Sequence, residues 1–501
     1  MIFRDWLKEL DYTLLQGSVD VETEDVIYDS RKAAPGKVFV AMKGIRVDGH
    51  SFIPQVLKAG VRVLVTERPV EEELKNSGLS EEELKQVTVV MVEEGRHALA
   101  LLSAARFDYP AKKLVMIGVT GTKGKTTTTH MIRAILLAAG KKVGMIGTTG
   151  TVIGDVVTPT LNTTPESYEL HQAFAQMVEA GCEYAVMEVS SQGIKMHRTD
   201  GLYFNYAIFT NISPDHIGPG EHADFEEYLY YKTRLLNMCG IGLVNKDDKH
   251  APQIIKAANC ELYTYSEESK EADFVASDIR YVSQPDFVGT EFHISGKYDM
   301  EVRLGIPGLF NVVNALAAVS VCSFLGLDQA RISHALENIR VNGRMEIVYT
   351  SERCTVLVDY AHNAVSMESL LSTLRDYKPK RLVCVFGCGG NRSKDRRYSM
   401  GEIGGKMADL SIITADNSRY EKVEDIIADI RGSIEKTGGK FIEIPDRREA
   451  IRYSILHAQP GDMVAVIGKG HEDYQEINGV RHHFLDREVI EETVKELGEK
   501  A

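Results

Sequence analysis

The chain has 501 residues, of which 44% are hydrophobic and 26% charged, and its formal net charge at pH 7 is −14. This composition predicts a globular protein of about two to four domains, and the negative charge argues against broad nucleic-acid binding, which needs a basic surface. No apolar run approaches the length of a membrane span and the seven scattered cysteines include no CxxC pair, so we expect a cytoplasmic protein with reduced thiols that neither enters a membrane nor binds nucleic acid.

Residues 1–110 mix short strands with short helices. Two β-branched runs, 38–41 and 61–65, predict strands, and we interpret Pro110 to Lys113 as a linker. We therefore expect a small N-terminal α/β domain over residues 1–110.

A glycine-rich turn at residues 121–127 stands between a predicted strand and a predicted helix. Its sequence, Gly-Thr-Lys-Gly-Lys-Thr-Thr, follows an apolar strand at 113–119 and precedes a helical run that ends at Ala139. In this arrangement the backbone N–H groups of the turn and the helix N-terminus point at one spot, which favours phosphate. Lys125 would reach the terminal phosphates, and the Thr126 hydroxyl would bind magnesium. The turn predicts a nucleoside triphosphate site, although the first glycine of the strict GxxxxGK[ST] pattern is absent.

Strands and helices alternate from residue 111 to about residue 341, which predicts a parallel sheet covered by helices and a central domain over 111–341. The predicted elements are strands at 113–119, 142–147, 184–189, 206–210 and 241–245, a strand-rich segment from Asp273 to Leu304, and a helix from Phe310 to Leu325.

Three residues of this central domain are candidates for metal ligands. Glu188 ends a predicted strand, and ligands in open α/β sheets lie at the carboxyl ends of strands, so we interpret it as the acidic magnesium partner of the phosphate loop. His216 follows the next strand, but its spacing alone favours an ordinary polar loop residue over a metal ligand. Lys232 lies on an amphipathic helix, where the residue pattern alone predicts a solvated side chain.

Residues 342–501 begin a second α/β pattern, with a hairpin at 345–358 and strands at 381–386, 410–414, 441–444 and 463–467. Three of these strands are followed by polar or glycine-rich loops, at 387–392, 416–419 and 468–472, which should converge on one crevice. Arg392 and Arg419 favour a carboxylate ligand there, because a guanidinium group grips a carboxylate with two parallel hydrogen bonds.

An ordered set of motifs along nearly the whole chain resembles the Mur ligases, the ATP-dependent amide-forming enzymes that build the stem peptide of peptidoglycan. The motifs are Asp29-Ser30-Arg31, Gly36 to Ala41, Gly121 to Thr127, Asn162-Thr163-Thr164, Met187 to Ser191, Asn211 to His216, Gly308 to Asn311 with Asn314-Ala315, Gly343 to Glu346, Asp359 to His362, Asp416 to Arg419 and Gly468 to Glu472. Within the family, the pattern is most similar to that of the enzymes that join a diamino acid to UDP-N-acetylmuramoyl-L-alanyl-D-glutamate.

The resemblance implies an α/β fold of three domains: a small N-terminal domain for the UDP end of the substrate, a central P-loop-type parallel-sheet domain for ATP and magnesium, and a Rossmann-like C-terminal domain for the amino acid. It implies ATP contacts at Gly121, Thr122, Lys123, Gly124, Lys125, Thr126, Thr127, Asn314, Arg344 and Asp359. It implies nucleotide-sugar contacts at Ser30, Asn162, Thr163, Thr164, Ser190 and Arg198, and amino-acid contacts at Arg392, Asp416, Asn417, Ser418, Arg419, Gly468 and Glu472.

Lys232 matches the position at which the family carries a carbamylated lysine. A neutral amine and carbon dioxide give an anionic carbamate, which can bind magnesium where an ammonium group would repel it. With Thr126, Glu188 and His216 it would complete the magnesium sites, and Lys125, Lys232, His216 and Glu188 would form the catalytic group. The implied reaction moves the γ-phosphoryl group of ATP to the substrate's glutamate carboxylate, and the amine of the amino acid then attacks this acyl phosphate.

Arg419 favours meso-diaminopimelate as the amino acid, because this molecule has a second carboxylate that lysine lacks. A buried site whose arginine finds no partner on lysine can favour diaminopimelate over lysine by about 10⁴ or more. Ser418 stands where the diaminopimelate-adding enzymes carry a proline. A serine in place of the proline would loosen the loop of Arg419, so L-lysine stays as a competing acceptor.

Two competing hypotheses concern the whole protein. A folylpolyglutamate synthetase-like ligase would share the ATP domain but lack a first domain for UDP. A non-catalytic module would bind the nucleotide without turning it over, although the presence of Lys232, Glu188 and His216 together weighs against it. We expect a monomer whose partners are ATP, the UDP-N-acetylmuramoyl dipeptide and meso-diaminopimelate.

Overall fold

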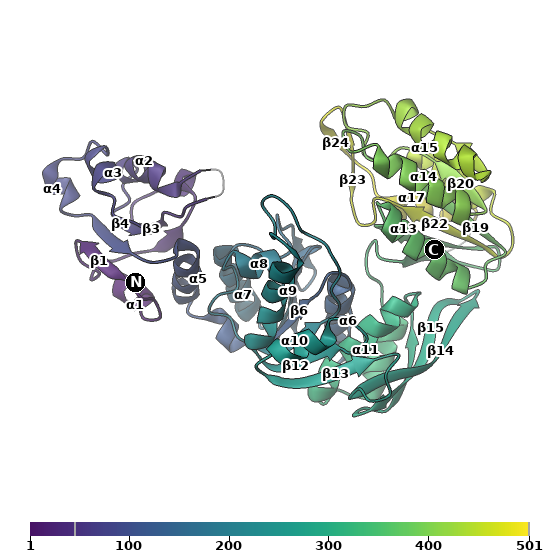
Figure 1. Ribbon diagram of the computed structural model, residues 1–501, viewed down its shortest axis with the longest axis horizontal. Helices are drawn as coiled ribbons and strands as arrows, with labels where there is room; N and C mark the ends of the chain where they lie inside the picture. The colour runs from purple at the N-terminus through teal and green to yellow at the C-terminus, as the bar shows by residue number, and fades with distance from the viewer. Residues whose placement is uncertain (45–46, 499–501) are drawn as a thin grey trace. The chain divides into compact units, whose positions relative to one another are not determined.

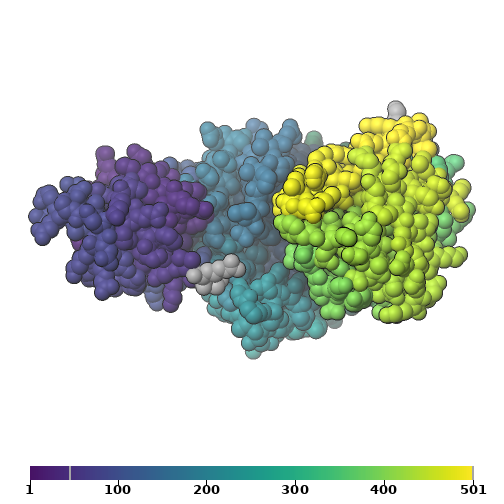
Figure 2. All heavy atoms as spheres, turned by 90° about the horizontal axis from the view of Figure 1, so that it is seen from above, coloured from purple at the N-terminus to yellow at the C-terminus, as the bar shows by residue number. Residues whose placement is uncertain are grey.

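The computed structural model describes residues 1–44 and 47–498. By its internal contacts the chain divides into unit 1, Met1–Tyr265, and unit 2, Ser266–Ala501. Figure 1 labels the helices and strands, and in Figure 2 the colour runs from purple at the start of unit 1 to yellow at the end of unit 2. Each unit has its own clusters of buried apolar side chains.

Unit 1 begins with a five-stranded sheet in the order β1-β5-β4-β3-β2, in which only β1 is antiparallel to its neighbour. Its strands are β1 Thr13–Gln16, β2 Asp25–Ile27, β3 Lys37–Val40, β4 Val63–Thr66 and β5 Thr88–Met91, and its helices are α1 Phe3–Trp6, α2 Ile53–Lys58, α3 Glu71–Lys75, α4 Glu81–Leu84 and α5 Gly95–Arg106. Val38 and Val40 pack against α1 and α5, whereas Phe39 packs against α2 on the other face. Both faces are thus buried, as is typical of parallel strands.

The second sheet of unit 1 has the strand order β13-β12-β11-β6-β10-β7-β8-β9. The strands are β6 Val115–Thr120, β7 Val143–Gly147, β8 Gly150–Ile153, β9 Val156–Thr158, β10 Tyr184–Glu188, β11 Phe204–Phe209, β12 Cys239–Asn245 and β13 Glu261–Ser266, and the helices are α6 Lys125–Ala138, α7 Ser167–Glu179, α8 Ser191–Lys195, α9 Phe225–Thr233 and α10 Ala251–Ala257. β6 lies between β10 and β11 and is parallel to both, so the loops after these three strands share one edge of the sheet.

The predicted strands of the first 265 residues are confirmed to within two residues, as is the helix after the glycine turn. The structure also contains strands that are not individually predicted, namely β1, β2, β5 and β13 and the antiparallel strands β8 and β9 within residues 150–158. The expected linker forms a short 3₁₀ turn, Pro110–Lys113, because Pro110 and Ala111 are buried against neighbouring apolar side chains.

Unit 2 begins with three antiparallel strands, β14 Phe274–Gln284, β15 Phe287–Gly296 and β16 Met300–Leu304, and the helices α11 Leu309–Phe324 and α12 Gln329–Glu337. A six-stranded sheet follows in the order β17-β18-β22-β19-β20-β21, antiparallel only between β17 and β18. Its strands are β17 Glu346–Thr350, β18 Cys354–Asp359, β19 Arg381–Phe386, β20 Leu410–Ile413, β21 Phe441–Glu443 and β22 Asp462–Ile467. The remaining elements are α13 Ala364–Asp376, α14 Asp395–Met407, α15 Val423–Thr437, α16 Arg447–Leu456, α17 Asp486–Glu496 and the hairpin β23 Tyr474–Ile477 with β24 Val480–His483.

Within the described residues, no helix combines the length and apolar character that a bilayer crossing requires. All seven cysteines are unpaired, and five of them are buried.

Candidate active site

The glycine turn between β6 and α6 is held against the loop that follows β11. Gly121 has a φ of +144°, and a Cβ on it would lie 1.9 Å from Oγ1 of Thr210. Thr210 Oγ1 donates to the Lys123 carbonyl over 2.6 Å, and the Thr122 amide donates to the Asn211 carbonyl over 2.8 Å. Only glycine fits this conformation and this close approach, so the predicted phosphate loop has a backbone shape that other residues would disturb.

Lys125 opens helix α6 and folds back over the turn. Its Nζ donates to the carbonyl oxygens of Gly121 and Thr122 over 2.8 and 3.1 Å. Gly124, with φ +87°, precedes the helix. The ammonium group and the N–H groups of the first helical turn therefore lie at the same end of α6, which suits an anion.

Glu188 lies at the carboxyl end of β10 and is 1% exposed. Its carboxylate accepts hydrogen bonds from the Thr126 hydroxyl over 3.0 Å, from the Thr148 amide over 2.9 Å and from the Thr148 hydroxyl over 3.3 Å. Within the described residues no basic side chain forms an ion pair with Glu188. The structure thus joins Thr126 and Glu188, as predicted, at a buried carboxylate.

Lys232 is 2% exposed, although the helix pattern suggests a solvated side chain. Its Nζ donates to the Gly121 carbonyl over 2.7 Å and lies 4.7 Å from the ring centre of Tyr228. Burial, together with repulsion from the Lys125 ammonium, lowers the pKa of Lys232 well below its usual range. The amine therefore lies under the phosphate loop in a setting that favours its neutral, nucleophilic form.

His216 lies on an exposed loop, with φ +53°. In the described part of the chain it donates its amide to Asp215, and its Nδ1 lies 3.1 Å from Glu221. No hydrogen bond joins it to Thr126, Glu188 or Lys232, so the structure groups those three around the phosphate loop and leaves His216 at the rim.

Four of the predicted nucleotide-sugar residues meet at the carboxyl end of β10. The Thr164 hydroxyl donates to the Glu188 carbonyl over 3.0 Å and accepts from the Ser190 amide over 2.9 Å. Arg198 donates to the Thr164 carbonyl over 2.9 Å, and Thr163 shares a 3.1 Å hydrogen bond with Thr148. This network contains Thr163, Thr164, Ser190 and Arg198.

The other two predicted nucleotide-sugar residues stand apart from this network. Asn162 is exposed on the loop that leads to it, and Ser30 lies in the short 3₁₀ turn after β2. Among the described residues, no hydrogen bond links either of them to Thr164 or Ser190.

The remaining predicted ATP contacts belong to unit 2. Asp359 ends β18, and its carboxylate accepts from the Met345 amide over 2.8 Å and the Ala361 amide over 2.7 Å. Burial raises the pKa of this carboxyl. The Arg344 guanidinium lies 5.0 Å from the ring centre of Tyr360, and Asn314 on α11 donates to the Asn311 side chain over 3.2 Å.

A cavity of about 430 Å³ opens in unit 2 where loops follow β18, β19, β20 and β22. Its lining includes six of the seven predicted amino-acid contacts: Arg392, Asp416, Asn417, Arg419, Gly468 and Glu472. The three loops thus converge as predicted. Ser418 is 2% exposed behind the cavity wall.

The loop of Arg419 is fixed by its backbone, although it lacks the proline typical of the family. The Asn417 carbonyl accepts from the Gly390 amide over 2.8 Å, and the Arg419 amide donates to the Glu476 carbonyl over 2.9 Å. The guanidinium of Arg419 donates to the Gly390 carbonyl over 2.7 Å and lies 3.5 Å from the Glu476 carboxylate. The serine in place of proline therefore leaves the loop anchored at both ends.

Lys469 contacts two of the residues that line the cavity, and sequence reasoning missed it. It is fully buried, and its Nζ donates to Asn417 Oδ1 over 3.2 Å and to Glu472 Oε2 over 3.1 Å. Asn417 in turn donates to Glu472 over 3.0 Å. The lysine thus orients the Asn417 amide and the Glu472 carboxylate at the cavity wall. Its position between Gly468 and Gly470, directly after a buried strand, was the sequence signal that could have indicated this role.

Thr148 and Tyr228 were also missed at the phosphate loop. Thr148 follows the predicted strand β7, so its position at a strand end was visible. Tyr228 precedes Lys232 by one helical turn, and its hydroxyl lies 3.1 Å from Oγ1 of Thr122. Cys388, which lines the unit 2 cavity, is no nucleophile, because burial raises its pKa to about 12.

Comparison with known proteins identifies the family. Three Mur ligase sequence families match: the Mur ligase family catalytic domain over residues 23–107, the middle domain over 119–322 and the glutamate ligase domain over 343–470. The UDP-N-acetylmuramoyl-L-alanyl-D-glutamate–2,6-diaminopimelate ligase of Caldanaerobacter subterraneus subsp. tengcongensis is 39% identical over 498 residues, which cover 98% of both chains. The chain belongs to the Mur ligase family. The resemblance seen in the motifs and the α/β fold class are thereby confirmed.

Solved structures agree with this membership. A structure of a UDP-N-acetylmuramoyl-L-alanyl-D-glutamate–2,6-diaminopimelate ligase matches with a TM-score of 0.72 and 30% identity, covering 95% of this chain and 96% of the other. Mycobacterium tuberculosis folylpolyglutamate synthase, solved with ADP and AMPPCP, shares the fold with a TM-score of 0.57 but only 18% identity, and covers 74% of this chain and 92% of its own. As a Mur ligase the chain is an ATP-dependent ligase, which excludes the hypothesis of a non-catalytic module.

Proposed function

We propose that the chain adds meso-diaminopimelate to the D-glutamate of UDP-N-acetylmuramoyl-L-alanyl-D-glutamate, with ATP as the energy source. The observation that carries this proposal is the unit 2 cavity, where guanidinium groups and carboxylates face the same space. The names of the relatives at about 38% identity support it. We place the reaction in the cytoplasm, because ATP and UDP-linked precursors are cytoplasmic metabolites.

The cavity suits the far end of diaminopimelate, which carries an ammonium and a carboxylate on one carbon. Arg419 and Arg392 offer paired donors for the carboxylate. Glu472 and the Asn417 side chain offer oxygen acceptors for the ammonium. Lysine has no carboxylate at this end, so it would leave the arginines without their partner, and we therefore rank it below diaminopimelate.

We further propose the division of labour expected of the family, with domains at residues 1–110, 111–341 and 342–501. The first holds the UDP end near Ser30, the second holds ATP, and the third holds the amino acid. The three family matches, over residues 23–107, 119–322 and 343–470, each fall within one of these proposed domains, which supports the division.

The residues around Glu188 suit a magnesium ion. A buried carboxylate and a threonine hydroxyl 3.0 Å from it are the oxygen ligands that Mg²⁺ prefers, and water completes such sites. Thr126 and Glu188 would hold the ion, with His216 reaching in from the rim. When bound, magnesium would offset the negative charge of the phosphates.

Lys232 suits carbamylation. Its low pKa leaves a neutral amine that can attack carbon dioxide, forming an N–C bond and releasing one proton. The anionic product would face the Lys125 ammonium, whose repulsion of a protonated Lys232 would thereby become attraction.

The chain's own residues then support two chemical steps. In the first, the substrate's γ-carboxylate attacks the γ-phosphorus of ATP, which gives an acyl phosphate and releases ADP. Lys125 leaves the two loop carbonyls and binds the transferring group, where it offsets the developing charge. In the second, the neutral amine of diaminopimelate attacks the acyl carbon, and phosphate and one proton leave as the amide forms. Arg419 and Glu472 orient the amino acid for this attack.

A test of the acceptor compares ATP-dependent coupling of meso-diaminopimelate and L-lysine by the wild type and by Arg419→Ala. We expect the wild type to prefer diaminopimelate by at least about 10³ in kcat/KM and the variant to lose most of that preference. Arg448→Ala, which removes an exposed arginine outside the cavity, is the matched control and should leave the preference unchanged. A wild type that couples lysine equally well would refute the role given to Arg419.

A further inference from the structure

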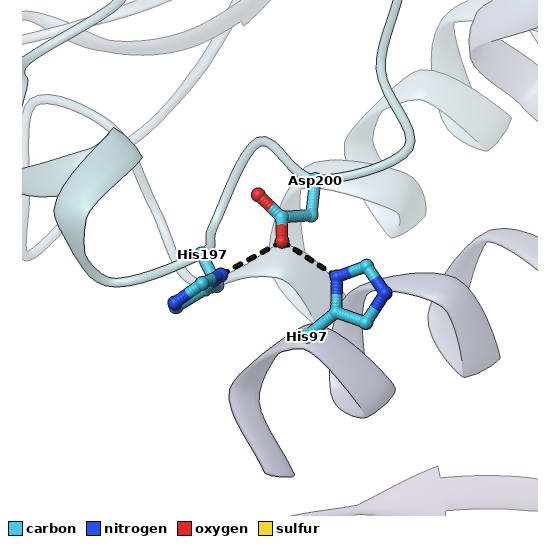
Figure 3. A group of neighbouring side chains, drawn as sticks. All are labelled: His97, His197 and Asp200. Atoms are coloured by element: carbon cyan, nitrogen blue, oxygen red, sulfur yellow. Dashed lines mark hydrogen bonds and ion pairs between the residues drawn. The ribbon is translucent and has the colours of Figure 1, made fainter. Parts of the chain in front are cut away.

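A cluster of two histidines and an aspartate lies outside the sites described above. Figure 3 shows His97 on helix α5 and His197 and Asp200 on the segment after α8, with the carboxylate between the two rings. Nδ1 of His97 lies 2.6 Å, and Nδ1 of His197 lies 2.8 Å, from the same Oδ2 of Asp200. The three ligand atoms all lie within 4.8 Å of one another.

Without a metal, both rings must carry a proton on Nδ1, because a carboxylate only accepts hydrogen bonds. A single cation can replace these two bridging protons if each ring moves its proton to Nε2. In a tetrahedral Zn²⁺ site, metal–ligand distances of about 2.0–2.2 Å place neighbouring ligand atoms about 3.3 Å apart. The two nitrogens therefore need to retreat from the carboxylate by only about half an ångström, which small side-chain rotations supply.

The surroundings leave room for this exchange. The side chains of His97 and His197 are 44% and 39% exposed, so a cation can enter and keep water in its fourth position. Besides Asp200, the charged groups that act on His197 are Glu94 and Arg96, whose charges have opposite signs. Asp200 is 23% exposed and has both rings as its partners.

The donor set indicates which ion would bind. Two imidazole nitrogens and one carboxylate suit Zn²⁺, Co²⁺ or Ni²⁺, whereas Mg²⁺ prefers oxygen ligands. The cluster is therefore chemically distinct from the oxygen-rich surroundings of Glu188.

We propose that His97, His197 and Asp200 bind a divalent transition-metal ion of the Zn²⁺ class, which joins helix α5 to the segment after α8. These elements are about a hundred residues apart in the chain, so the ion would act as a cross-link within unit 1. The segment carries Arg198 directly after His197, and Arg198 pairs with Glu166 over 2.6 Å. The cross-link would thus steady one wall of the Thr164 network.

The test titrates the full-length protein, stripped with a chelator, with Co²⁺ and then with Zn²⁺ in excess Mg²⁺. We expect one Co²⁺ per chain, with the strong visible absorption of tetrahedral cobalt, and its displacement by Zn²⁺. His97→Ala and Asp200→Asn should each weaken binding by more than about 100-fold, which exceeds the usual effect of losing an outer-shell partner. His334→Ala, which removes an exposed histidine on α12, should bind as the wild type does.

A second measurement separates metal binding from a purely structural hydrogen bond. Zn²⁺ should raise the thermal midpoint of the wild type and of His334→Ala but not of His97→Ala or Asp200→Asn. Three results would each overturn the proposal: the absence of a tetrahedral cobalt spectrum, the displacement of cobalt by Mg²⁺, or a cobalt spectrum that persists in both His97→Ala and Asp200→Asn. If His97→Ala fails to fold, the near-isosteric Asp200→Asn decides the outcome.

Discussion

The Lys232 amine is the side chain whose environment departs furthest from what its helix pattern predicts. Its one hydrogen-bond partner among the described residues is the Gly121 carbonyl, and Lys125 lies close enough to repel its charged form. Phe225, Tyr228 and Leu229 form an apolar stripe at helical spacing, and position 232 continues it, but a lysine at such a position usually extends its ammonium group into solvent. Its burial depends on the glycine turn more than a hundred residues earlier, which sequence periodicity cannot reveal.

Replacing Lys232 by alanine should reduce turnover by at least about 10³, because the carbamate that would bind magnesium beside the transferring phosphoryl group would be lost. Excess acetate or formate should restore part of the rate by occupying the vacated space. Labelled ¹³CO₂ should give a carbamate resonance in the wild type that the variant lacks. Lys256→Ala, on the exposed face of α10, is the control; normal turnover of the Lys232 variant would remove the carbamate from the mechanism.

His171 on α7 should make unit 1 sensitive to acid. Burial lowers its pKa to about 4, and neither ring nitrogen has a hydrogen-bond partner among the described residues. An unfolded histidine titrates near 6.5, so the unfolded state takes up the proton first as the pH falls. Because of His171, the free energy of unfolding of the wild type should fall by about 2 kcal/mol between about pH 7 and about pH 5. It should fall further as the pH approaches the pKa of His171 in the folded state.

His171→Leu should abolish this part of the acid sensitivity, which urea unfolding at the two pH values would measure. His334→Leu alters an exposed histidine and should keep the wild-type dependence. Equal acid sensitivity in His171→Leu and the wild type would mean that His171 is not buried in its neutral form.

At the scale of elements, the buried strands were predictable because their apolar runs are continuous and end at polar or glycine residues. The β8–β9 hairpin was missed even though Gly154-Asp155, a two-residue turn signal, separates two β-branched runs. Val156 and Val157 are exposed, so the hairpin lacks the alternating pattern of a half-buried strand. Its turn chemistry, rather than its hydrophobic pattern, was the usable signal.

The glycine turn before α6 yields a prediction at this scale. Gly121→Ala should weaken ADP binding by at least about tenfold, because its added methyl group would strike Thr210 and its φ of +144° is strained for alanine. Gly140→Ala provides the control: Gly140 also has a positive φ, +75°, but no atom lies within 4 Å of the added carbon. Calorimetric titration with ADP should separate the two variants, whereas equal affinities would show that crowding at the turn does not matter.

At the scale of the whole molecule, the order of the motifs along the chain predicted the family. This was possible because each motif is a short run of residues that can be recognised without knowing the fold. The cavity in unit 2 was predictable only in outline. Parallel strands bring the loops at 387–392, 416–419 and 468–472 to one edge. No local pattern encodes that Tyr474 lines the cavity or that Lys469 contacts the lining residue Asn417.

One buried ion pair supports unit 2 as a body. Arg447 and Asp486 are both fully buried and share two hydrogen bonds of 2.7 Å. Arg447 also donates to the carbonyls of Ala415 and Ile467, over 3.2 and 3.0 Å. These carbonyls directly precede two cavity residues, so the same arginine links the stability of unit 2 to the shape of its cavity.

Asp486→Ala should destabilise unit 2 by about 3–5 kcal/mol, because it leaves a buried guanidinium unpaired. The only tryptophan, Trp6, lies in the core of unit 1. In urea, the loss of circular dichroism should begin earlier in the variant while the tryptophan fluorescence transition stays in place. Glu496→Ala, which breaks an ion pair with Arg452, should alter neither curve. A shift of the fluorescence transition in Asp486→Ala would contradict an effect of this substitution that is confined to unit 2.

The distribution of thiols offers a way to label unit 2 at a chosen position. Cys322, Cys354, Cys384 and Cys388, the four cysteines of unit 2, are all buried, and the two half-buried ones, Cys182 and Cys260, belong to unit 1. A maleimide dye should therefore react slowly with native unit 2, because its four thiols are buried. A single cysteine introduced on the surface of unit 2 would therefore carry a fluorophore at one chosen position of this unit.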